Sequence, residues 1–569
     1  MNTDFQKLLQ EKEYLDKVIE VESFHYELFF KLRNGYQLPL TITFSPLFPT
    51  QLPIVHINQK YHHIPNIPHV MSSGLVCFLD KEGVIWSDLP ERTLDFVFNR
   101  VEQVLISDSP QIESHREFSY YFGTLDNIEP IFSVYTPDDE PKEISVLAMG
   151  GKPFAFLTDH MESRSLLGKL LNSNINSRNL EKAFYIPLDH TYEGKVPQLD
   201  RFWSNEEIIN IIRNHVTNDT LLKINKFSTN KKRYFYLLRI PLLTGDQTII
   251  GLWYEKINHS LSKRVNPLID DSIAEDFNVT PLFVFRNDDT TLVERGGGVQ
   301  KPLNALLVGC GSVGSDLLFM LARSGIKHFT LIDNDKLKIE NSYRHFMGMN
   351  KSIESKAKVK LLKEEFENRY PNVQIQTIEN EVLDTIENGK IDLADFDLIL
   401  VAIGDPNIER RLNKLILESS TPAIFTWVEA YGIGGHALVV NNGEKGCYEC
   451  LIDNELRMYS SFAGKSDIPF IKNMNGCAGS FTPYGSIDSM ETALLASRLV
   501  LKYLNNDIKG NPLVSWKGSA KTFEENGFLT SDRYKQPTDI LNHEDYEYIN
   551  KSCKICSNLK DEAYSNDQS

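Results

Sequence analysis

The sequence predicts an α/β protein of three domains, and three observations indicate this fold class. The chain has 569 residues, 41% of them hydrophobic and 24% charged. A chain of that length is too long to fold around a single hydrophobic core, and the composition is ordinary for a soluble globular protein. A strand meander punctuated by prolines opens the chain. After residue 304, a strand, a glycine-rich turn, a helix and a second strand follow one another, as in a mostly parallel sheet.

Residues 1–115 are expected to form a small α+β domain. Apolar residues recur at helical spacing over residues 4–19. Three strand-like runs follow, with prolines between the last two: 24–32, 38–44 and 54–57. A loop then carries His69 and Cys77, and a helix is expected over about 93–105.

Residues 116–295 are expected to form a mixed α/β domain that links its two neighbours. Stretches rich in β-branched and aromatic residues predict strands at 144–149, 153–158, 234–240 and 248–253. A helix is expected over about 206–215. We expect this domain to orient the first and third domains and to help dock a partner.

Residues 299–569 are expected to form the third domain. A buried-type strand at 305–308 runs into a glycine turn, a helix follows at 315–324, and a second strand at 329–332 ends at Asp333. A further apolar strand is expected at 398–401. Strands that alternate with helices imply a mostly parallel sheet with ligands at the carboxyl ends of its strands.

The glycine turn is the first candidate binding element. Gly309, Gly311 and Gly314 have the G-x-G-x-x-G spacing that brings backbone N–H groups and a helix N-terminus towards phosphates. Asp333 follows 19 residues after Gly314 and can bond a ribose hydroxyl. Both features suit an NAD enzyme as well as an ATP enzyme.

The polar residues that follow distinguish the two. They come in the order Asp335, Asn341, Arg344, Lys356 and Asp405. Adenylyl transfer needs cations to neutralise the triphosphate and a carboxylate to hold Mg²⁺. Hydride transfer has no such need, so this order favours ATP.

Residues 299–505 resemble the ThiF/MoeB family of adenylating enzymes, which includes the ubiquitin-activating enzymes. The resemblance rests on the glycine turn, on Asp333, on the Asn341 and Arg344 pair, on Lys356 before an alanine, and on Asp405 with Arg410. It implies a Rossmann-like fold, with Asp333 on ribose, Asp405 on Mg²⁺, and Arg344 and Lys356 on the phosphates. Lys358 is an alternative phosphate lysine, because the glycine usual before the motif lysine is absent.

Four of the seven cysteines form two C-x-x-C pairs about 100 residues apart: Cys447, Cys450, Cys553 and Cys556. Each pair places two thiolates on one turn, and two such turns can close a tetrahedral Zn²⁺ shell. A closed shell is structural, so zinc would hold the C-terminal segment against the third domain. Many members of the resembled family have such a site.

Two lone cysteines are candidate nucleophiles. Cys477 stands in a glycine-flanked polar loop, where a thiolate can attack an acyl adenylate and release AMP. In the activating-enzyme branch of the family, a cysteine of this region accepts the carrier protein as a thioester.

The segment around Cys77 resembles ubiquitin-conjugating enzymes. A histidine stands eight residues before the cysteine, Phe48 and Pro49 match the proline-rich turn, and Trp86 matches the tryptophan after the active cysteine. The usual His-Pro-Asn triplet is absent, so His69 is expected to be structural. The resemblance implies that Cys77 is a second thioester site.

Charge and composition exclude several classes of function. The formal net charge of −17 argues against general binding to nucleic acid or anionic membranes. No apolar run is long enough to span a bilayer, and the N-terminus lacks a basic-then-apolar signal segment. A cytoplasmic location is therefore expected, where cysteine pairs more often bind metal than form disulfides.

A conjugating-type module before an activating-type module resembles the bacterial ubiquitin-transfer fusion enzymes of CBASS anti-phage operons. The resemblance implies ATP, Mg²⁺ and structural Zn²⁺, a carrier that is the C-terminus of a cGAS-like nucleotidyltransferase, a target amine, and a homodimer. Three alternatives stay open: a sulfur-carrier activator for cofactor biosynthesis, which has no need of Cys77; an NAD oxidoreductase; and an inactive scaffold.

Overall fold

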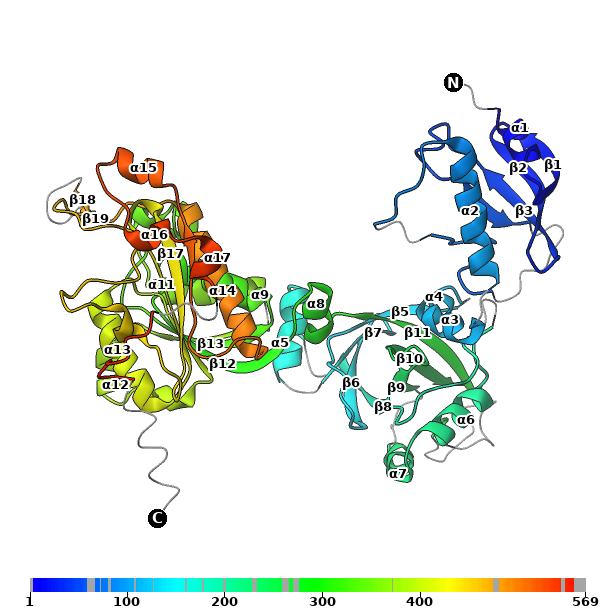
Figure 1. Ribbon diagram of the computed structural model, residues 1–569. Helices are drawn as coiled ribbons and strands as arrows, with labels where there is room; N and C mark the ends of the chain where they lie inside the picture. The colour runs from blue at the N-terminus through cyan, green and yellow to red at the C-terminus, as the bar shows by residue number, and fades with distance from the viewer. Residues whose placement is uncertain are drawn as a thin grey trace, which may run out of the picture. The chain divides into compact units, whose positions relative to one another are not determined.

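The computed structural model divides into two compact units, Met1–Asp288 and Asp289–Ser569 (Figure 1). It describes residues 4–58, 67–71, 73–79, 83–106, 109–125, 127–158, 161–175, 179–197, 201–227, 233–257, 266–269, 276–370, 372–473, 480–543 and 548–556. No helix among these residues is long and apolar enough to cross a membrane. The three-domain boundaries expected from the sequence stay a prediction.

The first unit opens with a four-stranded antiparallel sheet in the order β1-β2-β3-β4. Its strands are β1 (Leu15–Glu22), β2 (His25–Lys31), β3 (Gln37–Thr43) and β4 (Ile54–Ile57), with helices α1 (Phe5–Gln10) and α2 (Pro90–Leu105). One face of the sheet packs against the apolar side of α2 through Leu94, Val97 and Phe98. The expected meander and its closing helix are confirmed.

The helix expected over residues 4–19 is wrong beyond Gln10. Asp4 caps α1 by accepting a hydrogen bond from the Lys7 N–H, and the helix ends at Gln10. The next residues form β1, in which Val18, Ile19 and Val21 are β-branched. Such side chains suit a pleated strand paired with β2 better than a helix, so pairing overrides the weak helical spacing.

A closed seven-stranded barrel follows in the order β10-β11-β5-β7-β6-β8-β9. Its strands are β5 (Glu129–Ser133), β6 (Lys142–Met149), β7 (Lys152–Leu157), β8 (Leu180–Pro187), β9 (Arg233–Pro241), β10 (Gln247–Lys256) and β11 (Phe277–Arg286). Buried side chains that include Phe156, Tyr185 and Phe235 fill one core of the unit. Four of the strands were expected; β5, β8 and β11 were not.

Helices accompany the barrel. They are α3 (Pro110–Arg116), α4 (Phe118–Gly123), α5 (Met161–Leu170), α6 (Asn205–His215) and α7 (Asn218–Lys226). The expected helix is α6, which begins at a capping box between Ser204 and Glu207. Its Ile208, Ile211 and Ile212 pack with Trp203 and Tyr236 in a second apolar cluster.

The second unit is built on a seven-stranded sheet in the order β14-β13-β12-β15-β16-β17-β20. Its strands are β12 (Lys301–Val308), β13 (Ile326–Ile332), β14 (Gln374–Ile378), β15 (Leu398–Val401), β16 (Ala423–Val428), β17 (Gly434–Val440) and β20 (Leu513–Lys517). The first five in spatial order pair in parallel, and β17 and β20 pair antiparallel. The expected mostly parallel sheet is confirmed.

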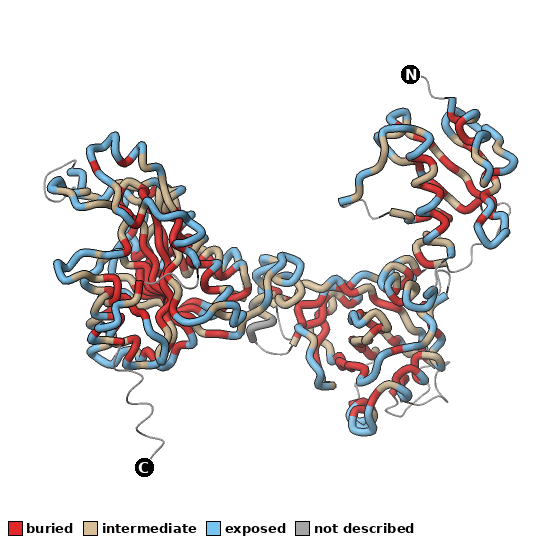
Figure 2. Tube along the Cα trace, in the orientation of Figure 1, coloured by how far each residue is buried: buried red, intermediate tan, exposed pale blue. Residues whose placement is uncertain are grey.

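Helices cover both faces of this sheet, and the strands between them are buried (Figure 2). Helices α9 (Ser312–Arg323), α11 (Lys358–Arg369) and α14 (Ser486–Leu504) share one core; α12 (Val382–Glu387) and α13 (Pro406–Ser419) share the other. Leu306 and Leu307 point into opposite cores, as successive strand residues do.

Short elements complete the second unit. They are α8 (Asp289–Arg295), η3 (Ile339–Asn341), α10 (Gly348–Ser352), η4 (Leu393–Asp395), η5 (Ala430–Gly432), η6 (Tyr448–Leu451), β18 (Lys472–Asn473), β19 (Ser480–Phe481), α15 (Ala520–Glu525), α16 (Asp532–Lys535) and α17 (Thr538–Leu541). A satellite cluster that includes Phe462, Phe523 and Phe528 joins the segment after β20 to the segment before β18.

Candidate active site

A cleft lies at the carboxyl ends of β12 and β13, where the sequence predicts a nucleotide site. Gly309 and Gly311 line it. Gly309 has φ of +90°, and a Cβ there would lie 2.6 Å from the Ala402 carbonyl oxygen. A Cβ on Gly314 would lie 2.0 Å from the Gly309 carbonyl oxygen. The turn therefore needs glycine at both positions, and helix α9 starts directly behind it.

Asp333 joins this turn to the end of β13. One of its carboxylate oxygens accepts a hydrogen bond from the Cys310 N–H at 2.7 Å, and the other accepts from the Asp335 N–H at 2.7 Å. Both acids line the cleft. A carboxylate at the end of the second strand suits a ribose hydroxyl, so the residues present fit a nucleotide.

The lysine that lines the cleft is Lys358 rather than Lys356. The Lys358 ammonium lies 2.7 Å from Asp335 and 3.9 Å from Asp333, and its side chain is 9% exposed. Lys356 is 47% exposed and pairs with Glu354 at 2.9 Å. The contact of Lys356 with a phosphate stays a prediction. Such a contact would require the Lys356 ammonium to leave Glu354.

Arg344 lies on a turn that Asn341 begins. The Asn341 carbonyl accepts hydrogen bonds from the N–H groups of Arg344 and His345, both at 2.9 Å. The Arg344 guanidinium stacks 4.4 Å from the ring centroid of Tyr484 and donates to the Thr482 carbonyl at 3.3 Å. These contacts hold the cation beside the segment that precedes α14.

Tyr484 also contacts the helix that follows the glycine turn. Its hydroxyl lies 2.9 Å from the Ser312 hydroxyl, at the first residue of α9. The N-terminus of a helix is where its unpaired N–H groups favour an anion. Arg344 and this N-terminus are thus joined through a single aromatic side chain.

His345 is a site residue that sequence reasoning missed. Its Nε2 donates to the Cys310 carbonyl of the glycine turn at 2.9 Å, and its Nδ1 accepts from the Met347 N–H at 3.2 Å. Burial lowers the pKa of His345 to about 4, so the ring is neutral near pH 7. The one feature of the sequence that could have indicated His345 is its position directly after Arg344.

Asp405 caps helix α13. Its Oδ1 accepts from the N–H groups of Asn407 and Ile408 at 2.9 and 3.3 Å, so the cap does not use Oδ2. The neighbouring Glu409 is buried and accepts from the Gly404 N–H at 2.9 Å. Burial raises the pKa of Glu409 to about 7. An oxygen ligand for Mg²⁺ at Asp405 fits this arrangement and stays a prediction.

Cys477 lies outside the described residues, which resume on both sides of it. Strand β18 ends at Asn473 and pairs antiparallel with β19, which begins at Ser480. The residues just after β19 are Thr482 and Tyr484, which contact Arg344. The described residues that follow the Cys477 segment therefore contact Arg344, a candidate phosphate residue.

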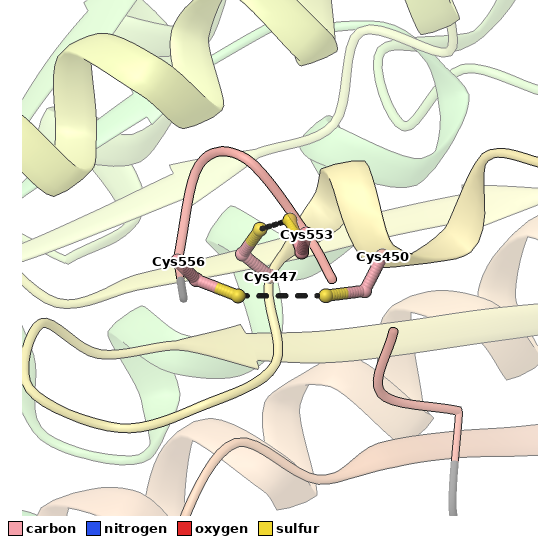
Figure 3. A group of neighbouring side chains, drawn as sticks. All are labelled: Cys447, Cys450, Cys553 and Cys556. Atoms are coloured by element: carbon pink, nitrogen blue, oxygen red, sulfur yellow. Dashed lines mark hydrogen bonds between the residues drawn. The ribbon is translucent and has the colours of Figure 1, made fainter. Parts of the chain in front are cut away.

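The four paired cysteines meet in one buried cluster, although over 100 residues separate the two pairs (Figure 3). All four sulfurs lie within 4.8 Å of one another, with Cys447 to Cys553 at 3.9 Å and Cys450 to Cys556 at 3.5 Å. These distances are too long for disulfides. Zinc–sulfur bonds of about 2.3 Å in a tetrahedron place sulfurs about 3.8 Å apart, so the cluster fits Zn²⁺.

Contacts around the cluster tie it to the nucleotide domain. Arg410 of α13 forms two hydrogen bonds with Glu449, which lies between the first two cysteines. The Tyr448 hydroxyl donates to Glu409 at 2.5 Å, next to Asp405. The metal-binding turn is thus packed against the helix that Asp405 caps.

Cys77 is exposed on the first unit and lines an apolar groove. The wall of the groove includes Phe44, Leu52 and Trp86, and the Trp86 indole donates to the Pro49 carbonyl at 2.8 Å. The matched tryptophan and proline turn therefore lie together beside the cysteine. Burial, followed by the charge of Glu117, raises the pKa of the Cys77 thiol.

His69 holds the loop of Cys77 in place. Its carbonyl accepts from the Cys77 N–H at 2.8 Å. Its ring lies 3.1 Å from Glu113 and 3.2 Å from Glu117, and both glutamates belong to the helical segment 110–123. The ring is occupied by these ion pairs, which agrees with the expected structural role.

We expect the pKa of His69 to lie above 6.5, because the Glu117 and Glu113 carboxylates stabilise its charged form. The ion pairs then add stability that is present below pH 6.5 and is lost as the pH rises through the raised pKa. NMR titration of the ring should show the raised pKa, and Glu117→Gln should lower it. His56, whose pKa burial lowers, is the internal control and should not respond. An unraised His69 pKa would contradict the ion pairs.

The fold and the cleft define an adenylating domain. Residues 299–513 match the model of the ThiF family. Over most of its length the chain is similar to two bacterial proteins named ATP-dependent ubiquitin transferase-like protein Cap2. The Pseudomonas aeruginosa protein is 25% identical over 499 residues, covering 82% of this chain and 85% of that protein. The Escherichia coli protein is 23% identical, covering 81% and 84%.

A shorter match is to SUMO-activating enzyme subunit 2 of Dictyostelium discoideum, 30% identical over 26% of this chain and 21% of that protein. A crystal structure of E. coli MccB with ATP is 18% identical over 47% of this chain and 70% of MccB, with a TM-score of 0.33, too low to support a structural argument. The matches to Cap2 and ThiF confirm the resemblance to bacterial enzymes of the ubiquitin-activating type. The conjugating-enzyme assignment of the N-terminal domain stays a prediction.

Proposed function

We propose that the chain activates the C-terminus of a carrier protein and links it to a target amine. The carrier carboxylate attacks the α-phosphorus of ATP, and pyrophosphate leaves. The Cys477 thiolate attacks the acyl carbon, and AMP leaves. The Cys77 thiolate then takes the acyl group, which frees Cys477, and an amine of the target forms the amide and releases Cys77.

The observation that carries this proposal is the contact of the described residues after the Cys477 segment with Arg344 and with the first residue of α9. Thr482 and Tyr484 follow that segment and bind Arg344, and Tyr484 also contacts Ser312 at the N-terminus of α9. A nucleophile must come within about 3–3.5 Å of the reacting carbon. An anchor at the candidate phosphate end of the cleft supports transfer from adenylate to cysteine.

The groove beside Cys77 supports the second thioester. Its described lining contains no charged side chain, and apolar residues such as Phe44, Leu52 and Phe78 dominate it. An extended, uncharged carrier tail fits this lining.

Homodimer formation is part of the proposal. Large apolar side chains are exposed on the second unit, with Tyr343 at 85%, Ile353 at 75% and Ile487 at 74%. Exposed apolar residues near a site favour a protein partner. A cGAS-like nucleotidyltransferase as carrier and a role in anti-phage defence follow from the resemblance to CBASS enzymes.

The sulfur-carrier alternative is less well supported. It would require residues 299–569 and would have no use for Cys77. The match to the Pseudomonas protein covers 499 residues, which is more than that part of the chain contains. The similarity thus extends into the first unit, where Cys77 stands.

Carrier-dependent exchange of pyrophosphate into ATP tests the first step. The probe is a cGAS-like nucleotidyltransferase, with its C-terminus free or amidated. We expect exchange only with the free carboxylate. Cys477→Ala should keep exchange and lose the thiol-sensitive adduct, whereas Cys77→Ala should keep the adduct on Cys477 and lose ligation.

Two outcomes would contradict the proposal at different steps. Equal exchange with the amidated carrier would exclude activation of its C-terminus. Ligation by Cys77→Ala at the normal rate would exclude the relay and leave activation intact.

A further inference from the structure

The two strands that flank the Cys477 segment form a very small hairpin. Among the residues that the structure describes on either side of Cys477, β18 and β19 pair Lys472 with Phe481 and Asn473 with Ser480. A two-stranded hairpin alone is marginally stable in water, so two residue pairs need support from outside. That support comes from the turn that follows β16.

Tyr431 stands in this turn and contacts both sides of the hairpin. Its N–H donates to the Pro483 carbonyl at 2.5 Å, just after β19. Its ring lies 5.2 Å from the Lys472 ammonium, within β18. One residue thus contacts the chain before and the chain after Cys477.

The backbone of Tyr431 is held in an uncommon conformation. Its φ is 56° and its ψ 18°, the left-handed region that non-glycine residues rarely adopt. Neighbouring residues enclose the turn, since a Cβ on Gly432 would lie 2.3 Å from Asp488. Strain of this kind persists where the surroundings enforce it and is concentrated at functional sites.

The ring of Tyr431 packs against a cluster of phenylalanine rings. Its centroid lies 5.0 Å from Phe528 and 6.3 Å from Phe523, and Phe470 lies 4.8 Å from Phe528. Glu429, two residues before Tyr431, accepts hydrogen bonds from the N–H groups of Phe462 and Ala463 at 2.6 and 3.0 Å. The turn is therefore hydrogen-bonded to residues 462–463, which precede β18, as well as to Pro483, which follows β19.

The turn also lies at the edge of the sheet that holds the cleft. Strand β16 runs parallel to β15, and β15 runs parallel to β12, so their carboxyl ends share one edge. From this placement we infer that Tyr431 is a positioning residue for the thioester step, which braces the Cys477 hairpin against the edge of the nucleotide-binding sheet. The inference rests on the proposed function for its chemical consequence.

The test uses the full-length chain and two changes that leave the fold intact. Tyr431→Asn removes the ring, and asparagine tolerates the left-handed backbone. Lys472→Gln removes the exposed charge over the ring, with Lys465→Gln, another exposed lysine of the same segment, as its control. Tyr431→Phe keeps the ring and should behave as wild type.

We expect Tyr431→Asn to slow single-turnover transfer to Cys477 by about tenfold or more and to change pyrophosphate exchange by less than about twofold. Lys472→Gln should slow transfer by about threefold. Amide hydrogen exchange at residues 472–473 and 480–481 should rise in both variants. A purely structural role would instead lower the exchange of pyrophosphate and the transfer step together.

Amide hydrogen exchange tests the role of Tyr431 in bracing the hairpin, and this measurement does not require the carrier protein. Wild-type protection of the hairpin in both variants would overturn the inference, as would wild-type transfer in Tyr431→Asn. A wild-type chain without carrier-dependent pyrophosphate exchange would contradict the proposed function alone, and hydrogen exchange would still decide on Tyr431.

Discussion

Replacement of Arg344 by alanine is expected to lower carrier-dependent pyrophosphate exchange by about 10²–10³-fold, the usual effect of removing one charge-stabilising group from a transition state. The guanidinium is held beside the N-terminus of α9 through Tyr484, whose hydroxyl meets Ser312. In the proposed mechanism this permanent cation offsets the negative charge that develops during adenylyl transfer. Arg344→Lys should recover only part of the rate, because lysine keeps the charge and loses the planar fork.

Arg323 provides a matched control for this variant. It is an exposed arginine at the last turn of α9, and its guanidinium stacks on Phe319 at 5.1 Å, much as Arg344 stacks on Tyr484. Arg323→Ala should leave exchange unchanged. If Arg344→Ala kept exchange and lost only the thioester, Arg344 would be an anchor for the Cys477 segment and not a phosphate contact.

Sequence reasoning predicted the glycine turn and the acid at the end of the second strand well, because short-range geometry determines them. Gly309 and Gly314 are required by a turn whose backbone leaves no room for a Cβ, and Asp333 follows directly from the length of one helix and one strand. Such constraints act within about 25 residues of the chain, and a spacing pattern can express them. The four-cysteine cluster was predictable for a different reason, because metal chemistry restricts the residue type at each position.

The remainder depends on contacts between distant segments. Closure of the barrel requires the parallel pairs β5 with β11 and β8 with β9, which no local pattern specifies. Lys356 and Lys358 differ by two positions, and which one faces the cleft depends on a turn in which Ser355 has φ of 51°. Likewise Tyr431 meets Pro483 across 52 positions of the chain, so its place beside the Cys477 hairpin appears only in three dimensions.

Loss of zinc is the other large expected effect, and Cys553→Ser should cause it. Three remaining sulfurs leave a tetrahedral site open, and the apparent binding free energy of structural zinc, about 10–16 kcal/mol in zinc-finger peptides, is folding free energy. We expect Tm to fall by about 10 °C, which is the shift that several kcal/mol produce in a domain of this size. Metal analysis should find one zinc per chain in the wild type and less in the variant.

The first region to respond should be residues 548–556, whose contacts with the domain centre on the cysteine cluster. The Tyr548 hydroxyl donates to the Asn511 carbonyl at 2.7 Å, and Tyr548, Ile549 and Ile555 pack in the apolar cluster that contains the four cysteines. One hydrogen bond is worth about 1 kcal/mol, and the apolar contacts surround the metal site, so loss of the metal weakens the attachment of the segment. Chelation should therefore raise amide exchange at 548–556 before the sheet unfolds.

Cys77→Ser is the matched control, because it makes the same chemical change at an exposed cysteine of the other unit. It should leave Tm, zinc content and exchange at 548–556 unchanged. Wild-type protein free of zinc, or a Cys553→Ser variant with the wild-type Tm, would show that the four thiols pack without a metal. In that case burial of Cys447 and its three partners would have to stabilise the C-terminal segment as an ordinary apolar contact.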